Sequence, residues 1–417
     1  MAIATDLGKF RAIRPIEIVA FQFAVLNRPR LTQWETMISA SLLCCGLPSD
    51  VTLQHIRRMV LVGISQAALL AALGCGQGKD TKPEVSIEQP AGPIAELSWV
   101  RPAYGLSIEP VWGLKGALNV GLWPTSGPRG LIRIYAPYLG QPFPRMVNFI
   151  SVEPIVWGVR GQSELEIGLQ SGQMGLTMMT SDTPPTAAPP EPLLPTPGRI
   201  EHEDGSEILT FCLATEPFRN GARPLIQILL RADRPHEVGF RVYAAAGSAP
   251  MEACVLSATM GNYSQLRRLW LRGEVVDARK LWPAFQPDRL GFAPWRMWGR
   301  DRLLTRDGTI FVAARSDEPE PGRAQYDPDV APYWRYEGRA ATQYWRTANA
   351  DGAKVQVNGR SNYWGNGGRI PGGTSFENFE LKLPFAEGQE FWFGVTPEEP
   401  AELGFDPAWQ RNITNGN

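Results

Sequence analysis

The residues best suited to chemistry lie in the last quarter of the chain, where the triplet Tyr-Trp-Arg occurs twice, at 333–335 and 344–346. Gly338 between the copies predicts a turn, and two strands folded back there would set Trp334 and Trp345 side by side. Indole faces flanked by Arg, Glu and Asn suit sugars, because a pyranose stacks on the ring while its hydroxyls find polar partners. The predicted carbohydrate-binding residues are Trp334, Tyr336, Trp345, Asn362, Tyr363 and Trp364.

A polysaccharide lyase is one reaction that fits these residues. Tyr344 or Tyr336 would remove the proton α to a uronate carboxylate. Arg335 and Arg346 would neutralise that carboxylate as the enolate-like transition state develops.

A glycoside hydrolase is the other reaction. It needs two carboxyl groups about 5–9.5 Å apart, one of them acting as the acid. Glu337 would pair with Glu153 or Glu377, while Glu164 and Glu166 are further carboxylates beside apolar segments. Spacing along the chain does not fix these distances, and a surface salt bridge is the commoner fate of a carboxylate.

The alternative is that the aromatic cluster belongs to the core. Trp and Tyr are common inside β-sandwiches, and alternation along a strand buries about half of its side chains. The protein would then be a non-catalytic glycan-binding or scaffold protein. Trp392, between Phe391 and Phe393, has no polar neighbours suited to a ligand and is predicted to be buried.

Several other classes of site are not supported by the sequence. The Gly-rich stretch 365–373 lacks the Gly-Lys-Ser/Thr ending of a phosphate-binding loop. His202 and His236 are the histidines past residue 75, too few beside two cysteines to predict a zinc site. No metal and no cofactor is therefore predicted. A net charge of −1 excludes a general nucleic-acid binder.

An export signal lies unusually deep in the chain. Arg57 and Arg58 precede an apolar run from Met59 to Leu73, which ends in Gly74 and Cys75. The residues Leu70-Ala-Ala-Leu-Gly-Cys75 resemble a bacterial lipobox, and Arg57-Arg-Met-Val-Leu61 resembles a twin-arginine signal. The resemblance implies that Cys75 is lipidated and becomes the new N-terminus. A buried core helix ending in Gly-Cys is the alternative.

This signal sets the expected organisation of the chain. Residues 1–50 are predicted to be a spurious or atypical extension, 51–75 the signal peptide and 76–95 a tether. A first β unit spans 96–182 and a second, packed with it, spans 199–417. Between them, residues 183–198 carry a run of prolines, which predicts a loop or linker.

The elements that must hold these residues are mostly strands. The chain contains 42 Gly and 37 Pro among 417 residues, which leaves little room for long helices. Hairpin turns are predicted at Asp-Gly or Asn-Gly pairs, namely 204–205, 307–308, 351–352 and 358–359. Phe379, Leu381, Leu383 and Phe385 alternate with polar residues, and residues 390–395 form a buried strand. One helix is predicted over residues 263–281.

The predicted fold is therefore mainly β, a large antiparallel β-sandwich or double sandwich with few short helices. Cys212 and Cys254 lie in apolar segments and are predicted to be two buried free thiols, with one disulfide as the alternative. We expect an exported, lipid-anchored protein of the cell envelope or extracellular space that binds or cleaves carbohydrate. Its contact with the membrane would be through the anchor alone, and it would bind no nucleic acid.

Overall fold

The computed structural model describes residues 98–414 except for 104–108, 123–128, 142–144, 170–171, 184–194, 286–290, 349 and 365–367. The predicted signal peptide, the lipidation site Cys75, the tether and most of the proline-rich run lie outside these residues. Within the described part of the chain, no helix is both long and apolar enough to cross a membrane.

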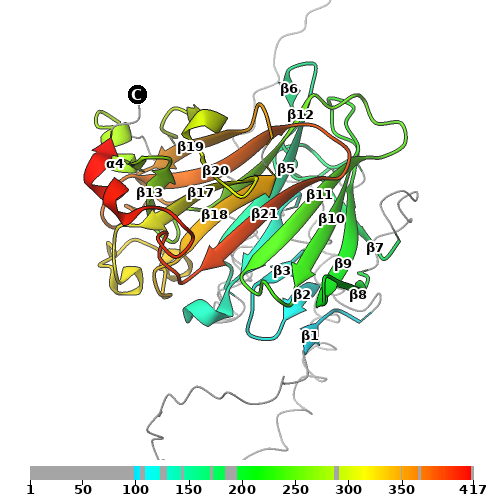
Figure 1. The fold of residues 1–417 in the computed structure, drawn as a ribbon, viewed down its shortest axis with the longest axis horizontal. Helices are drawn as coiled ribbons and strands as arrows, with labels where there is room; N and C mark the ends of the chain where they lie inside the picture. Colours follow the sequence, from blue (N-terminus) through cyan, green and yellow to red (C-terminus); the bar gives the residue numbers. More distant parts are fainter. Residues whose placement is uncertain are drawn as a thin grey trace, which may run out of the picture. The chain divides into compact units, whose positions relative to one another are not determined.

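Two large sheets stack face to face (Figure 1). The ten-stranded sheet runs β1 (Trp99–Val100), β2 (Val111–Leu114), β3 (Asn119–Gly121), β4 (Ile132–Tyr135), β5 (Asn148–Val156), β12 (Ala253–Thr259), β20 (Ser375–Pro384), β19 (Lys354–Arg360) and β15 (Arg296–Gly299), with β6 (Val159–Arg160) beside β5. Every pairing in this sheet is antiparallel among the described residues.

The twelve-stranded sheet is also antiparallel in its described pairings, except that the short edge strand β22 (Ile413–Thr414) pairs parallel with β14 (Glu274–Asp277). It runs β22, β14, β13 (Leu266–Leu271), β17 (Thr309–Ser316), β18 (Thr342–Ala348), β21 (Gln389–Thr396), β11 (Glu237–Ala244), β10 (Pro224–Arg231), β9 (Ser206–Thr215) and β7 (Met178–Ser181), with β16 (Leu304–Arg306) beside β17 and β8 (Arg199–Glu203) beside β9. The short helices are η1 (Pro137–Leu139), α4 (Ala278–Leu281), η2 (Arg300–Arg302), η3 (Pro321–Arg323), η4 (Pro332–Trp334) and η5 (Pro407–Asn412). The predicted antiparallel sandwich is confirmed.

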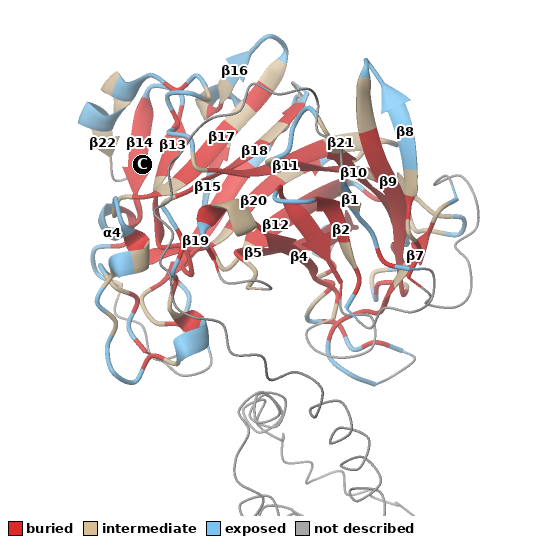
Figure 2. Ribbon diagram, turned by 90° about the horizontal axis from the view of Figure 1, so that it is seen from below, coloured by how far each residue is buried: buried red, intermediate tan, exposed pale blue. Residues whose placement is uncertain are grey.

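The core fills the space between the sheets, where the strands are almost wholly buried (Figure 2). Trp112 of one sheet stacks on Phe211 of the other with ring centroids 4.2 Å apart. Phe379, Leu381 and Leu383 of β20 are fully buried in this core, as their alternation predicted. Such burial is the main source of stability, since each large apolar side chain contributes about 1.5–3 kcal/mol.

Three of the four predicted turns are turns. At 204–205 and 307–308 both residues have positive φ, between 49° and 77°, as a two-residue hairpin requires. Gly352 likewise turns the chain between β18 and β19. The fourth is wrong, because Asn358 and Gly359 lie inside β19 at a register shift. The extra residue of this shift lies on β20, where two residues face Asn358, and the Asn358 side chain accepts a hydrogen bond from the backbone N–H of Asn378.

The helix predicted over 263–281 is also wrong. The segment forms β13 and β14, joined by a turn at Gly273 with φ 81°, and only α4 is helical. The apolar spacing fits both periods, and pairing with β17 decides for strand. Asp277 starts the short helix by accepting a hydrogen bond from the N–H of Arg279 at 2.9 Å.

Strands from both sides of the proline-rich run share the two sheets. β5 pairs with β12, and β7 pairs with β9, so residues 94–417 form one compact unit. Cys212 and Cys254 are buried and unpaired, as predicted. Burial raises the pKa of these thiols, to about 11 for Cys212 and about 12 for Cys254, and so keeps both protonated.

Candidate functional site

The structure places the predicted site residues in three separate regions. Tyr344, Trp345 and Arg346 lie on β18 in the twelve-stranded sheet, and Glu153 lies on β5 in the other sheet. The third region is one of turns and loops and holds Trp334, Arg335, Tyr336, Glu337, Asn362, Tyr363 and Trp364. Residues 332–334 form the helix η4, so the two Tyr-Trp-Arg copies are not adjacent strands, and that prediction is wrong.

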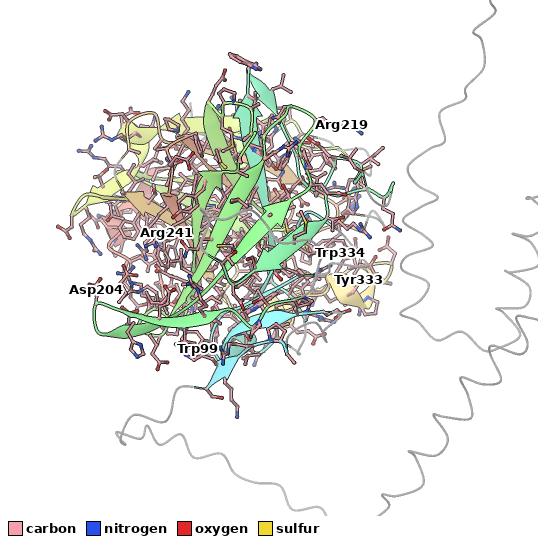
Figure 3. All side chains as sticks on the ribbon, turned by 90° about the vertical axis from the view of Figure 1, so that its right-hand side faces the viewer. Trp99, Asp204, Arg219, Arg241, Tyr333 and Trp334 are labelled. Atoms are coloured by element: carbon pink, nitrogen blue, oxygen red, sulfur yellow. The ribbon has the colours of Figure 1, made fainter. Side chains whose placement is uncertain are left out.

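The rings expected to face a sugar are mostly buried. Trp345 is fully buried, and its indole N–H donates to the carbonyl of Phe379 at 2.9 Å, between the sheets. Trp334, beside Tyr333 in Figure 3, is 7% exposed and stacks on the fully buried Tyr363, with centroids 5.4 Å apart. As sugar platforms these three rings are wrong predictions, since no flat face is open to solvent. Trp364 differs and is 42% exposed.

Tyr344 and Arg346 both contact Glu237 on the outer face of the twelve-stranded sheet. Glu237 was not among the residues predicted from the sequence. The Tyr344 hydroxyl and the Arg346 Nε both donate to Oε1 of Glu237, each at 2.7 Å. Burial, and then the charge of Glu237, raise the pKa of Tyr344 far above its ordinary value. Arg346 also lies 4.6 Å from the ring of Trp392, which is buried as predicted but does have polar neighbours. A protonated phenol bonded to a carboxylate is a poor base, so the geometry does not support the lyase roles.

The other predicted catalytic residues are held by neighbours. The Tyr336 hydroxyl donates to the carbonyl of Arg339 at 2.7 Å, and Arg335 Nε donates to that of Val330 at 3.1 Å. Glu337 is half-exposed and pairs with Arg145 at 3.1 Å. None of these contacts brings a second carboxylate to Glu337 among the described residues.

Glu153 belongs to a built polar site on the outer face of the ten-stranded sheet. Directly paired residues of neighbouring strands point to the same face. The pairings of β5, β12, β20, β19 and β15 therefore make one row across the sheet, consisting of Ser151, Ser257, Glu380, Gln356 and Met297. The next row, Val152, Leu256, Leu381, Val355 and Trp298, faces the core.

Arg160 links Glu380 of this row to Glu153, which lies two residues further along β5 on the same face. Its guanidinium binds Glu153 and also Glu380, the latter at 2.7 Å, while the Ser151 hydroxyl donates to Glu153 at 2.8 Å. Gln356 donates to the other oxygen of Glu380. The Glu153 and Glu380 side chains are 3% and 1% exposed, and that of Arg160 is 22% exposed. We call these five residues the Arg160 centre.

The Arg160 centre holds excess negative charge in a buried place. Burial raises the pKa of Glu153 well above its ordinary value, opposed by Arg160 and reinforced by Glu164 and Glu380. One arginine cannot neutralise both partner carboxylates, so the charge of Glu380 favours the protonated form of Glu153. Because both carboxylates bind one nitrogen, their nearest oxygens lie within roughly 6 Å of each other. A retaining glycosidase holds its acid and its nucleophile about 5–5.5 Å apart, a separation that this upper bound allows.

Exposed side chains line the sheet edge beside the Arg160 centre. The ring of Trp295, 43% exposed, lies 5.6 Å from the Arg160 guanidinium. Met297, paired with Gln356, is half-exposed. Trp295 stands in a Pro-Trp-Arg-Met-Trp run that adds to the aromatic content of this part of the chain, but it is not among the carbohydrate-binding residues predicted from the sequence.

A second arginine, Arg360, lies between two exposed aromatic rings. Arg360, at the end of β19, is buried 4.7 Å from the Phe292 ring and 4.9 Å from the Trp364 ring. The two rings are 6.3 Å apart and nearly half-exposed. We call Phe292, Trp295 and Trp364 the aromatic edge, because Phe292 and Trp295 lead into the edge strand β15. Asn362, predicted as a ligand residue, positions Arg360 through its backbone carbonyl, which accepts the Arg360 Nε–H at 3.1 Å.

Glu377 is buried next to Arg360. Burial raises the pKa of Glu377 to about 7, while the charge of Arg360 and a hydrogen bond with Asn262 oppose the rise. Its Oε2 has no hydrogen-bond partner among the described residues. Glu377 can therefore hold a proton at neutral pH. The groups that set its pKa include no second carboxylate, so they provide no partner for a hydrolase pair.

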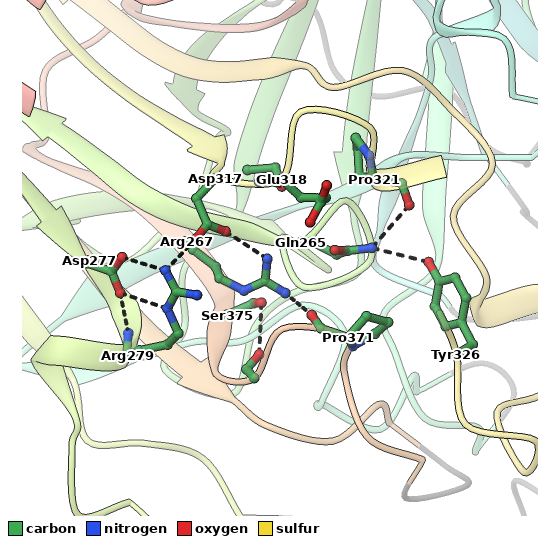
Figure 4. A network of polar contacts seen from close by, with 12 residues as sticks. Gln265, Arg267, Asp277, Arg279, Asp317, Glu318, Pro321, Tyr326, Pro371 and Ser375 are labelled. Carbon is green, nitrogen blue, oxygen red and sulfur yellow. Dashed lines mark hydrogen bonds and ion pairs between the residues drawn. The ribbon is translucent and has the colours of Figure 1, made fainter. Parts of the chain in front are cut away.

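A polar network ties the neighbouring loops to β13 (Figure 4). Arg267 binds Asp317 at 2.9 Å, and Arg279 binds the other oxygen of Asp317. Gln265 donates to the hydroxyl of Tyr326 at 3.3 Å, and that hydroxyl also accepts the backbone N–H of Tyr336. These bonds fix the loops that carry Trp334 and Tyr336. The aromatic side chains of these loops are therefore held in place although they do not lie on strands.

Within the described residues, no group of three or more His, Cys, Asp or Glu side chains could hold a metal ion. No protein-family model matches the chain, and no curated protein sequence matches it either. The side chains of the site are therefore what indicates the function.

Proposed function

We propose that the protein binds carbohydrate on the outer face of the ten-stranded sheet, along the aromatic edge and at the Arg160 centre. The observation that carries this proposal is the exposed Trp295 ring over Arg160, a guanidinium that two buried carboxylates hold in place. A flat ring beside a fixed polar group is what sugar recognition needs. The predicted export and the lipid anchor at Cys75 would present this face to envelope or extracellular glycans.

Binding is favoured over cleavage because Arg160 covers the carboxylates. Their side chains are nearly inaccessible, so a ligand would contact Arg160 and the rings first. Hydrolysis is the second candidate, favoured by the raised pKa of Glu153 beside Glu380. It requires Arg160 to move so that the glycosidic oxygen can reach Glu153.

The test measures binding of the full chain to a panel of soluble polysaccharides by calorimetry and affinity electrophoresis. Trp295→Ala and Trp364→Ala should each weaken binding by roughly tenfold or more, since removing a stacked aromatic commonly costs about 2 kcal/mol. Ile200→Ala, which removes an exposed apolar side chain on β8 of the twelve-stranded sheet, is the control and should bind as the wild type does. Equal binding by all three variants, or no binding by the wild type, would refute the proposal.

Reducing-end release from the bound polysaccharide tests the second candidate. Glu153→Gln should abolish release while it leaves binding within a few fold, because the amide keeps the shape but cannot donate the proton. Release that survives in Glu153→Gln and in Glu380→Gln would exclude this pair as catalytic.

A further inference from the structure

Exposed apolar side chains concentrate in one short stretch of the chain. Of the thirteen exposed large apolar residues in the described part, six lie between residues 157 and 174, each 47–77% exposed. They are Trp157, Val159, Leu165, Ile167, Leu169 and Met174. Scattered apolar residues need no explanation, but a contiguous set marks a contact surface. We call these six residues the apolar tip.

The apolar tip begins at a strained position. Val156 pairs with Val159, so Trp157 and Gly158 are the two turn residues of the β5–β6 hairpin, which projects from the sheets at the top of Figure 1. Their φ angles are 51° and 71°, in the left-handed region that Asn and Gly favour. A bulky aromatic residue is unfavourable there and gains little from packing, because it is 76% exposed. Folding does not explain this tryptophan.

The rest of the apolar tip is held open by its backbone. Ile167 bridges to Met174, and the N–H of Leu176 donates to the carbonyl of Ser163 at 2.7 Å. Glu166, buried at the base, accepts the backbone N–H of Arg219 at 2.8 Å. These bonds fix the loop so that its apolar side chains do not fold back onto the body.

The composition of the apolar tip decides what it contacts. Sugar platforms are flat rings with polar partners, whereas Val159, Leu165 and Leu169 are branched aliphatic chains that offer neither. Aliphatic side chains with a tryptophan at the front suit the boundary between lipid headgroups and acyl chains. We propose that the apolar tip inserts into the surface of a lipid bilayer.

A pocket beside the tip supplies the polar part of this contact. It has a volume of about 460 Å³, and Trp157, Leu165, Arg160 and Arg219 are among its walls. Figure 3 labels Arg219 in the loop after β9. Among the described residues no carboxylate pairs with the Arg219 guanidinium, so it is available for a lipid phosphate. The predicted lipid anchor would then be a second attachment, as stable membrane association commonly requires.

The test uses the full chain carrying Cys75→Ser, so that no lipid is attached. Hydrogen–deuterium exchange of peptides covering 155–176 is measured with phosphatidylcholine vesicles, with and without phosphatidylglycerol, because this readout is local even if another segment binds lipid. We expect exchange in these peptides to slow by on the order of tenfold on vesicles, and more so with the anionic lipid. Arg219→Gln should remove the preference for the anionic lipid.

The double variant Trp157→Gly with Leu169→Ser should lose this protection, whereas Tyr333→Ala, an exposed ring in the helix η4, should keep it. Unchanged exchange on both vesicle types would overturn the proposal, and so would protection that persists in the double variant. Protection by a soluble polysaccharide instead of vesicles would assign the tip to sugar. The carbohydrate proposal is tested at Trp295 and Trp364, so either proposal can fail without the other.

Discussion

Replacing Glu377 by Gln tests directly how burial affects the ionisation of this carboxyl group. The pKa of Glu377 is raised from an ordinary 4.5 to about 7 by burial. A carboxyl group whose folded pKa lies above its unfolded pKa stabilises the fold fully below the unfolded value, and this contribution is lost as pH rises through the folded pKa. The loss should therefore occur between about pH 4.5 and 7. A shift of this size corresponds to about 3 kcal/mol, at 1.36 kcal/mol per pKa unit.

The Gln side chain is neutral at every pH, so Glu377→Gln removes this loss. The difference in unfolding free energy between variant and wild type should change by about 3 kcal/mol in favour of the variant between pH 4 and pH 8. In melting temperature this is roughly 5 °C for a unit of this size. Thermal and urea unfolding, followed by circular dichroism across that range, measures the difference, and any constant offset from the amide cancels.

Glu337→Gln is the matched control, because it changes a half-exposed carboxylate that pairs with Arg145 at the surface. Its effect should stay below about 1 kcal/mol at every pH. If the Glu377→Gln difference is the same at pH 4 and pH 8, then Glu377 does not lose stabilisation on ionising. That result would refute the explanation that burial, with no hydrogen-bond partner for Oε2, raises the pKa of Glu377.

Four further substitutions separate the roles of other side chains, each measured by urea unfolding. Arg160→Met should cost about 3–5 kcal/mol at neutral pH, with part recovered in acid, because it leaves buried carboxylates unpaired; a loss below 1 kcal/mol contradicts this. Trp345→Ala should cost about 3–5 kcal/mol while Trp295→Ala costs less than about 1 kcal/mol, and similar losses would show that both rings are core. Trp157→Gly should raise stability by up to about 1 kcal/mol, because glycine accepts the left-handed turn; a clear loss would show that the indole packs.

The faces of the strands could be predicted from the sequence because alternation is local. Phe379, Leu381 and Leu383 point to the core, and Glu380 points outward, as their pattern required. The error at 263–281 has the opposite cause. Its leucines fit a helix as well as strands, and only pairing with β17, fixed by the whole fold, decides between them.

The site was harder to predict because register is a property of the whole fold. Glu153 was singled out, but its partners Arg160 and Glu380 were not, since nothing local places β20 two strands away from β5. The doubled Tyr-Trp-Arg triplet misled for the same reason. One copy lies in a helical turn and the other in a central strand, so equal sequences acquired unrelated surroundings.

A signal for the Arg160 centre was nevertheless present in β5. All nine of its residues are buried, so both faces of this strand are covered. A strand covered on both faces is ordinarily apolar throughout, because a buried charge needs a compensating partner. The run Phe-Ile-Ser-Val-Glu-Pro-Ile-Val breaks that rule at Ser151 and Glu153, so the rest of the fold has to supply the partner. Arg160, four residues past the end of the strand, is that partner, and it carries the site to the surface beside Trp295.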